Sequence, residues 1–172
     1  MKRSISLILL YGSMAFAQNA TLTKIVDGDT VYFSNGDKCR IAFIDTAESK
    51  FNEKVKRDAS KCNGITVDTM VDAGKAASKQ AKTLLNVGTS YRYDSIGSDQ
   101  YGRSICVLKL QGGDTFNIAM VKSGYAVAFG KYIEDDKTYR SFYGAMRDAK
   151  QQNVGLWGSK RPVMECMETI DR

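Results

Sequence analysis

The sequence predicts an α+β fold in which a five-stranded β-barrel carries about three packed helices. Short runs rich in Val, Ile, Thr, Tyr and Phe, bounded by turn residues, occupy residues 21–50 and return at 89–110. Apolar residues at helical spacing occupy residues 67–85 and 136–152. The 172 residues suffice for one domain with a core and are too few to suggest two.

The N-terminus has the pattern of a secretory signal. Lys2 and Arg3 precede a mostly apolar run over 5–16, and Ala15-Phe16-Ala17 fits a small-x-small cleavage site. The run is shorter than the roughly 18 residues that a membrane span needs, so a membrane anchor is the weaker alternative. We expect residues 1–17 to be removed, leaving one domain over 18–172 that is secreted or periplasmic. Loss of the two cations lowers the formal charge from +6 to +4, which still suits a polyanionic partner.

The first predicted sheet segment is a three-stranded antiparallel meander over residues 21–50. Its strands are separated by Asp27-Gly28-Asp29 and Asn35-Gly36-Asp37, which are residue types that form tight turns. In such a meander the third strand ends beside the first turn. We therefore expect Asp29 and Asp45 to lie at one edge of the sheet.

Oxygen ligands gather at that edge. Thr46 and Glu48 follow Asp45 in a loop, where the apolar pattern requires neither residue. A cluster of carboxylates and carbonyls suits hard divalent cations, and Ca²⁺ in particular because it accepts a loose geometry.

The rest of the chain alternates between loops, helices and strands. Residues 51–64 are lysine-rich without apolar periodicity and predict a mobile surface loop. The elements expected after this loop are a helix over 67–85 capped by Thr66, strands over 89–93 and 103–110 with a polar loop at 94–102, a short helix from Asp114 or Thr115 to Val121, and a helix over about 136–152 with an apolar aromatic face. Three strands, a helix, two strands and terminal helices match the order of an OB barrel, and an α+β sandwich is the alternative.

Cysteine and histidine usage narrows the chemistry. The four cysteines include no C-x-x-C pair, which disfavours zinc, and a secreted chain favours disulfides. Three pairings are possible, and we favour Cys39 with Cys106 and Cys62 with Cys166. The chain has no histidine, so Ser-His-Asp hydrolysis and imidazole-based metal sites are excluded.

Five short motifs carry a family resemblance. They are Val-Asp-Gly-Asp-Thr-Val at 26–31, Cys-Arg-Ile at 39–41, Ile-Asp-Thr-Ala-Glu at 44–48, Asp-Gln-Tyr-Gly-Arg at 99–103 and Gly-Leu-Trp at 155–157. Together, and in this order, they resemble the staphylococcal nuclease (thermonuclease) family over about residues 20–157. The resemblance implies a secreted, Ca²⁺-dependent phosphodiesterase on an OB barrel that cuts DNA and RNA to 3′-phosphates.

The resemblance also implies a role for each site residue. Asp29 and Asp45 would bind the metal through carboxylates and Thr46 through its carbonyl. Glu48 would activate the attacking water, as the general base. The remaining roles are Arg40 and Arg103 on the phosphate, and Tyr101 and Tyr132 along the nucleotide pocket. We expect a monomer that has no membrane contact once the signal is removed.

Several assignments have competing interpretations. Asp27 is expected to shape its turn rather than bind metal. On a straight strand Arg40 would lie roughly 16 Å from Asp45, so its role requires a bend in that strand. The aromatic residues around Tyr132 could equally be packing. Ala47 and Gln100 depart from the family, which usually has Pro and Lys at these positions, so the loop of Glu48 and one phosphate contact could be weakened.

Two other functions fit parts of the sequence. One is a non-catalytic OB module that binds single-stranded nucleic acid, and the retained acids at 29, 45 and 48 argue against it. The other is a secreted protein stiffened by disulfides that holds Ca²⁺ for structural reasons.

Overall fold

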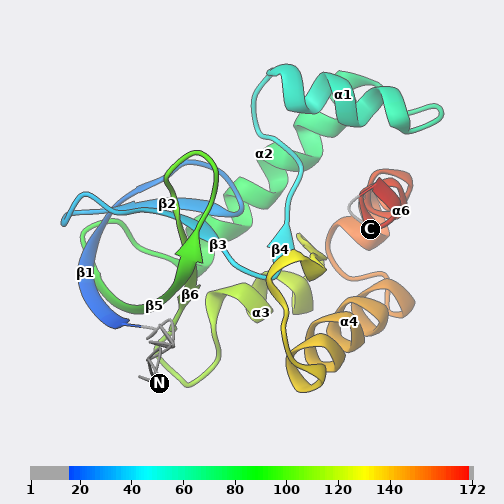
Figure 1. Ribbon diagram of the computed structural model, residues 1–172. Coiled ribbons are helices and arrows are strands. Elements are labelled where there is room, and N and C mark those ends of the chain that lie inside the picture. Colours follow the sequence, from blue (N-terminus) through cyan, green and yellow to red (C-terminus); the bar gives the residue numbers. More distant parts are fainter. Residues whose placement is uncertain (1–15, 171–172) are drawn as a thin grey trace, which may run out of the picture.

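The computed structural model describes residues 16–170, which form one barrel and a set of helices (Figure 1). The predicted signal over residues 1–17 lies almost entirely outside the described residues and stays a prediction. Within the part that is described, no helix is both long and apolar enough to cross a membrane.

Five strands close the predicted barrel. They are β1 (Phe16–Ile25), β2 (Thr30–Phe33), β3 (Lys38–Ile41), β5 (Ser90–Ser98) and β6 (Ser104–Leu108). The order around the barrel is β1-β2-β3-β6-β5, with β5 also pairing with β1. Only β3 and β6, among these pairs, run parallel. The meander and the OB-type barrel are therefore confirmed, and the α+β sandwich is not what forms.

The remaining elements lie to one side of the barrel in Figure 1, with α3 and β4 between the barrel and the outer helices. They are β4 (Ile44–Asp45), α1 (Glu53–Lys61), α2 (Val67–Leu84), α3 (Phe116–Lys122), β7 (Val127–Ala128), the 3₁₀ turn η1 (Gly130–Tyr132), α4 (Asp136–Gln151), α5 (Leu156–Ser159) and α6 (Arg161–Ile170). The described residues thus hold six α-helices, more than the three or so expected. The predicted caps are confirmed at Thr66 and Thr115, whose side chains accept from the N–H groups of Thr69 and Ile118.

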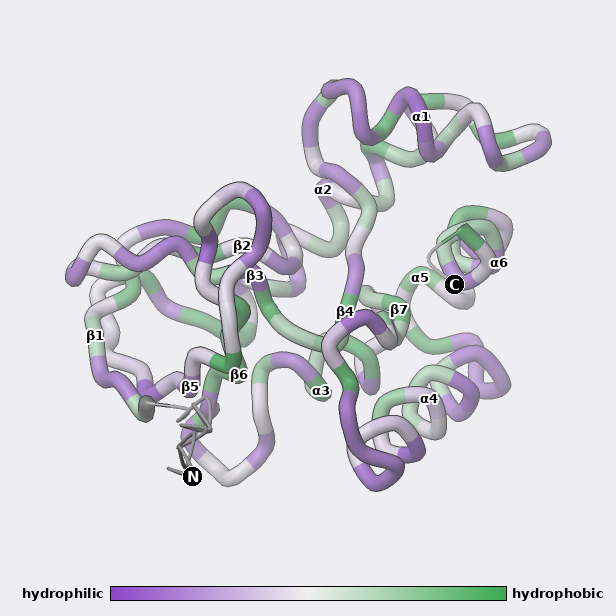
Figure 2. The backbone as a smooth tube through the Cα atoms, in the orientation of Figure 1, coloured by the Kyte–Doolittle hydropathy of each residue, from purple (hydrophilic) through white to green (hydrophobic). Residues whose placement is uncertain are grey.

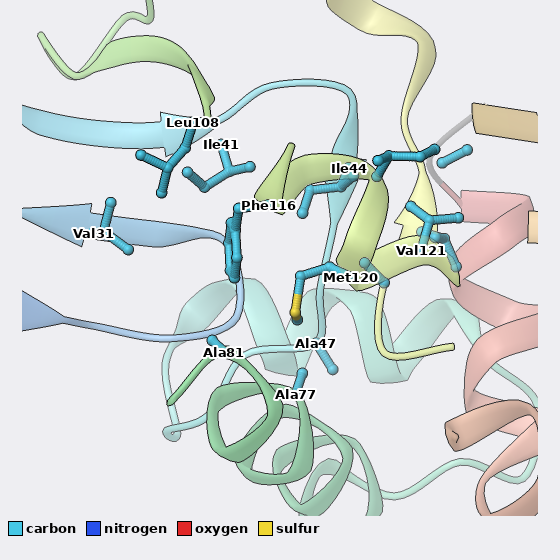
Figure 3. Packing of buried hydrophobic residues seen from close by; sticks show 14 of the residues in the cluster. Val31, Ile41, Ile44, Ala47, Ala77, Ala81, Leu108, Phe116, Met120 and Val121 are labelled. Atoms are coloured by element: carbon cyan, nitrogen blue, oxygen red, sulfur yellow. The ribbon is translucent and has the colours of Figure 1, made fainter. Parts of the chain in front are cut away.

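One apolar core runs from the barrel into the helices. Phe116 lies in its centre, with Val31, Ile41 and Leu108 of the barrel on one side and Met120 on the other (Figure 3). Hydrophobic residues gather on β4 and β7, whereas hydrophilic residues are frequent along α1 and the outer turns of α4 (Figure 2). The core therefore fixes β4, the strand that carries Asp45, against the barrel.

Both favoured disulfides are confirmed. Cys39–Cys106 joins β3 to β6, and Cys62–Cys166 joins the C-terminal end of α1 to α6, each with a Cα–Cα distance of 5.6 Å. The second bond attaches α1, which is otherwise a peripheral helix, to the body of the protein.

The third strand does not continue to Asp45 as we expected. It ends at Ile41, the chain turns at Phe43 with a φ of 69°, and β4 pairs with β7 instead. The buried amide of Asn117 stabilises this bend, because it donates to the carbonyls of Ala42 (2.9 Å) and Cys106 (3.0 Å).

Two predictions about loops are wrong. Residues 53–61, assigned to a mobile loop, form α1, because Asn52 caps the helix and accepts from the Val55 N–H at 2.8 Å. Residues 94–98, assigned to a polar loop, extend β5 and pair with β6 as far as Ser98. Both segments are polar, so they showed no apolar pattern from which the helix or the strand, which has a register shift between Ser95 and Ser98, could be predicted.

Candidate active site

Asp29 and Asp45 come together at one end of the barrel, as expected, but the bend at Phe43 brings them together rather than a continuous third strand. Asp29 ends the turn before β2, and Asp45 ends β4 beside it. Both side chains are buried. Between them lies the Arg40 guanidinium, with Nη1 3.3 Å from Asp29 Oδ2 and Nη2 2.6 Å from Asp45 Oδ1. The bend at Phe43 thus supplies the approach of Arg40 to Asp45 that a straight strand would forbid.

Thr46 and Arg40 hold Asp29 in its ionised form. The Thr46 backbone N–H and hydroxyl each donate to Asp29 Oδ2 at 2.9 Å. Burial alone would raise the pKa of Asp29, but the charges of Arg40 and Lys54 and the Thr46 hydrogen bonds outweigh it and lower that pKa. Thr46 contacts the site through donors, and the role of its carbonyl stays a prediction.

Glu48 lies at the solvent side of the cluster. Its Oε1 is 3.1 Å from Lys54 Nζ, and its Oε2 accepts from the Asn52 amide at 2.8 Å. The side chain is 23% exposed, so water can reach it.

Lys54 is an unexpected member of the cluster. Its ammonium contacts Asp45 Oδ2 at 3.4 Å and Asp58 Oδ2 at 3.8 Å in addition to Glu48. Burial lowers the pKa of Lys54, but the carboxylates of Asp45, Asp29 and Glu48 have the larger combined effect and raise it.

Asp27 shapes the turn, as expected. Its Oδ1 accepts from the Asp29 N–H at 3.1 Å. Burial, followed by the nearby charge of Asp29 and that of Glu48, raises the pKa of Asp27 to about 7. Asp27 is therefore a carboxyl that titrates near neutral pH beside two acids with predicted functional roles.

Arg103 is connected to Asp29 through the hydroxyl of Thr30. Asp99 orients it, since Oδ2 of Asp99 is 2.7 Å from both Nε and Nη2 of the guanidinium. Arg103 Nη1 also lies 3.5 Å from the Thr30 hydroxyl, which donates to Asp29 Oδ1 at 3.1 Å. Although burial acts to raise it, these bonds and those from the Arg103 and Tyr101 N–H groups hold the pKa of Asp99 below its usual range.

The two predicted nucleotide-pocket tyrosines are placed differently. Tyr101 is 76% exposed, with its ring 5.6 Å from the Arg103 guanidinium carbon. Tyr132 lies in η1, just after β7, and its ring meets Phe129 edge-on at 6.2 Å. The structure joins Tyr101 to the site through Arg103. Tyr132 follows β7, which pairs with the β4 strand that carries Asp45.

Helix α2 fixes the backbone that carries Glu48. A Cβ added at Gly74 would overlap the carbonyl group of Glu48 and lie 2.6 Å from the carbonyl oxygen of Ala47. A Cβ at Gly28 would lie 2.8 Å from the Thr46 side chain. Only glycine allows this spacing, so α2 and the first turn clamp residues 46–48 between them.

The donor set suits a hard cation, although no cage is preformed. Among residues 16–170, no group of three His, Cys, Asp or Glu side chains is arranged to hold a metal ion. Instead, cationic side chains occupy the acids: Arg40 bridges Asp29 and Asp45, and the Lys54 ammonium lies among carboxylate oxygens. These carboxylate oxygens already surround positively charged groups, and carboxylate oxygens are the ligands that Ca²⁺ prefers.

Sequence reasoning missed Lys54, Asn52, Asp58 and Asp99. The first three lie on or beside α1, whose charged sequence hid its helical character. The signal was present in Asn52-Glu53, a capping residue followed by an acid, with Val55 and Ala59 four residues apart on the buried face. Asp99 belongs to the Asp-Gln-Tyr-Gly-Arg motif at 99–103, but the family resemblance assigned a function only to Tyr101 and Arg103 in that motif.

Comparisons with known proteins place the sequence in a family. A family model described as staphylococcal nuclease homologue matches residues 38–159. The chain is 27% identical over 147 residues to a Bacillus subtilis protein named endonuclease YhcR, covering 83% of this chain and 12% of that protein. It is 32% identical over 148 residues to an uncharacterized protein of Methanocaldococcus jannaschii, covering 79% of this chain and 70% of the other. This chain therefore spans only a small part of the length of the Bacillus relative.

Proposed function

The chain belongs to the family of staphylococcal nuclease homologues, and on that premise we propose that it is a Ca²⁺-dependent nuclease. It hydrolyses phosphodiester bonds of DNA and RNA and leaves 3′-phosphates. The name of the Bacillus relative, an endonuclease, supports the reaction class.

The observation that carries this proposal is one connected polar network. It runs from Arg103 through the Thr30 hydroxyl to Asp29, then through Arg40 to Asp45. Lys54 continues it from Asp45 to Glu48. Two guanidiniums and three acids are thus held by four separate parts of the chain around one end of the barrel. A fold needs no such convergence for its stability, and buried ion pairs are weak evidence of stability in any case.

Asp29, Asp45 and the Thr46 carbonyl would hold the Ca²⁺. When bound, the cation supplies positive charge to the phosphate and makes a water molecule more acidic. Asp29 is prepared for this role, because its lowered pKa keeps it ionised.

Glu48 is the general base of the proposal. It accepts the proton of the attacking water as the water oxygen adds to phosphorus. The bond from phosphorus to the 5′-oxygen breaks in the same displacement, and the leaving 5′-oxygen takes a proton from solvent. The partial exposure of Glu48 lets the attacking water reach it. Removal of one of its two present donors, Lys54 or Asn52, frees an oxygen for this proton.

Arg40 and Arg103 stabilise the charge that accumulates on the phosphate oxygens. Each guanidinium has two N–H edges: Asp99 holds one edge of Arg103 and leaves the rest directed toward Thr30. Arginine suits this role because its planar fork meets two oxygens at once and keeps its proton. Tyr101, exposed beside Arg103, and Tyr132 line the nucleotide pocket.

The charge and the disulfides of the chain also support a substrate class and a cellular compartment. The basic chain acts on polyanionic substrates, as a monomer, in the secreted or periplasmic compartment that a removed signal and two disulfides suit. No membrane contact is needed.

The experiment is digestion of single-stranded DNA and of RNA by the purified protein, with Ca²⁺ and with chelator, alongside Glu48→Gln. We expect cleavage only with Ca²⁺ and loss of cleavage in the variant with unchanged nucleic-acid binding. Cleavage in chelator contradicts the metal assignment. If the unmodified protein binds nucleic acid without cleaving it, it is a non-catalytic binding module. If it neither binds nor cleaves nucleic acid but Ca²⁺ raises its melting temperature, it is a structural Ca²⁺ protein.

A further inference from the structure

Lys54, to which the family resemblance assigns no role, contacts three carboxylates of the site. It lies in the first turn of α1, which Asn52 caps, and its ammonium contacts Asp45, Glu48 and Asp58 at 3.4, 3.1 and 3.8 Å. Arg40 holds Oδ1 of Asp45, and Lys54 holds Oδ2. Both oxygens of this proposed metal ligand therefore face a side-chain cation.

A divalent cation and the ammonium cannot share the outer oxygen of Asp45. Carboxylate oxygens bind Ca²⁺ at about 2.3–2.6 Å, whereas Lys54 Nζ lies 3.4 Å from the same oxygen. The two positive charges would repel one another strongly in a site screened little by water. One of them has to move.

Lys54 is able to move. Its side chain is 34% exposed and flexible, and Asp58 Oδ2, 3.8 Å from the ammonium, is an acceptor that it can approach more closely when it leaves Asp45. Asp45, by contrast, is buried at the end of β4. Helix α1 itself stays in place, since Cys62–Cys166 attaches its C-terminal end to α6.

We propose that the Lys54 ammonium is an intramolecular competitor of the divalent cation, occupying the outer oxygen of Asp45 until the cation displaces it. This inference rests on the metal site of the proposed function. Displacement also frees Oε1 of Glu48 when the ammonium turns to Asp58, so the arrival of the cation and the release of the base are one event. The metal-free protein is thereby kept folded and unreactive.

The test is Ca²⁺ binding measured by calorimetry on the full chain after removal of metal, without nucleic acid. Lys54→Met removes the charge and should bind Ca²⁺ at least tenfold more tightly. Lys54→Arg keeps a competing cation and should bind close to the unmodified protein. The control is Lys56→Met, because Lys56 lies on the same helix but pairs only with exposed Glu53 among the ion pairs of the described residues, and its affinity should not change.

A second readout covers folding. In chelator, Lys54→Met should melt at a lower temperature than the unmodified protein, because Asp45 and Glu48 lose a partner, and Ca²⁺ should raise its melting temperature more. If Lys54→Met does not fold, Lys54→Gln, which can still donate to Glu48, replaces it in both measurements.

Equal or weaker Ca²⁺ affinity in the folded charge-removing variant overturns the proposal, and so does absence of Ca²⁺ binding in both proteins. Tight binding in Lys54→Met, together with no cleavage of nucleic acid by the unmodified protein, leaves the competitor in place and rejects the nuclease function. The two failures are therefore distinguishable.

Discussion

The Arg40 guanidinium lies 2.6 Å from the carboxylate of Asp45, only five residues away along a chain that has turned back at Phe43. The same guanidinium lies 3.3 Å from Asp29. Two buried acids of the proposed metal site thus share one buried cation.

Replacement of Arg40 by Met should destabilise the metal-free protein by about 3–5 kcal/mol, because two buried carboxylates lose the guanidinium that they share. Ca²⁺ should restore part of this loss by neutralising them, and Arg40→Lys should be intermediate. Urea unfolding with chelator and with Ca²⁺ measures both effects. An Arg40→Met protein as stable as the unmodified one in chelator would show that the acids do not need the guanidinium.

Replacement of Arg103 by Ala should lower kcat about 10²–10³-fold, the usual effect of losing one donor to a charge that develops in the transition state. Folding should be retained, since Asp99 still accepts from the backbone N–H groups of residues 101 and 103. Arg92→Ala, which removes an exposed arginine on the β5 strand, is the matched control and should leave kcat unchanged. Equal kcat in both variants would remove Arg103 from the mechanism.

Gly74→Ala should be harmful although it adds a good helix former. The new methyl group overlaps the Glu48 carbonyl, so we expect a loss of about 1–3 kcal/mol from overpacking and at least a tenfold fall in kcat from displacement of Glu48. Gly144→Ala, in α4 with nothing within 4 Å of the added carbon, should instead stabilise by up to about 1 kcal/mol. Melting temperatures and initial rates of both variants test this prediction. Equal changes in the two variants would contradict the role of Gly74 in holding the backbone of Glu48.

Asp27 should make stability depend on pH in the metal-free protein. Folding raises its pKa from 3.8 to about 7, so the folded state binds the proton more tightly than the unfolded state. Its contribution is then fully present below about pH 4, is lost as the pH rises to about 7, and stays lost above that. Asp27→Asn removes this dependence while keeping an oxygen for the Asp29 N–H.

At pH 8 Asp27→Asn should therefore be more stable than the unmodified protein by about 1–2 kcal/mol, allowing for its partial exposure, and at pH 4 the two should be alike. Denaturant unfolding in chelator at the two pH values measures the difference. Asp72→Asn, which alters an exposed acid of α2, should show no such difference. A gain of the same size at both pH values would exclude the titration of Asp27 as its cause.

The features that could be predicted from the sequence are those that depend on neighbouring residues in the chain. The turn acids at 27–29, the capped helix after Thr66 and the barrel order follow from turn residues and apolar periods. The turn that places Asp29 at one end of the barrel belongs to the predicted meander, whereas the approach of Asp45 to Asp29 does not, because Asp45 lies in β4 and pairs with β7.

The features that it did not predict depend on distant contacts. The bend that brings Arg40 to Asp45 needs a left-handed Phe43 and the Asn117 amide, which comes from a helix some 75 residues later in the chain. Helix α1 and Lys54 were not predicted because the segment is highly charged and shows little apolar periodicity. The helix is stabilised instead by its cap, by a few buried residues such as Val55 and by the disulfide bond to α6. Tyr132 shows the opposite case, since the family resemblance gave it a role that its packing on Phe129 neither requires nor excludes.

The two disulfides are interleaved along the chain, since Cys62 lies between Cys39 and Cys106, and Cys106 lies between Cys62 and Cys166. A single proteolytic nick anywhere from residue 39 to residue 166 consequently leaves two fragments that are still covalently joined. Such a cut would go unnoticed on a non-reducing gel and would separate only after a thiol reductant is added.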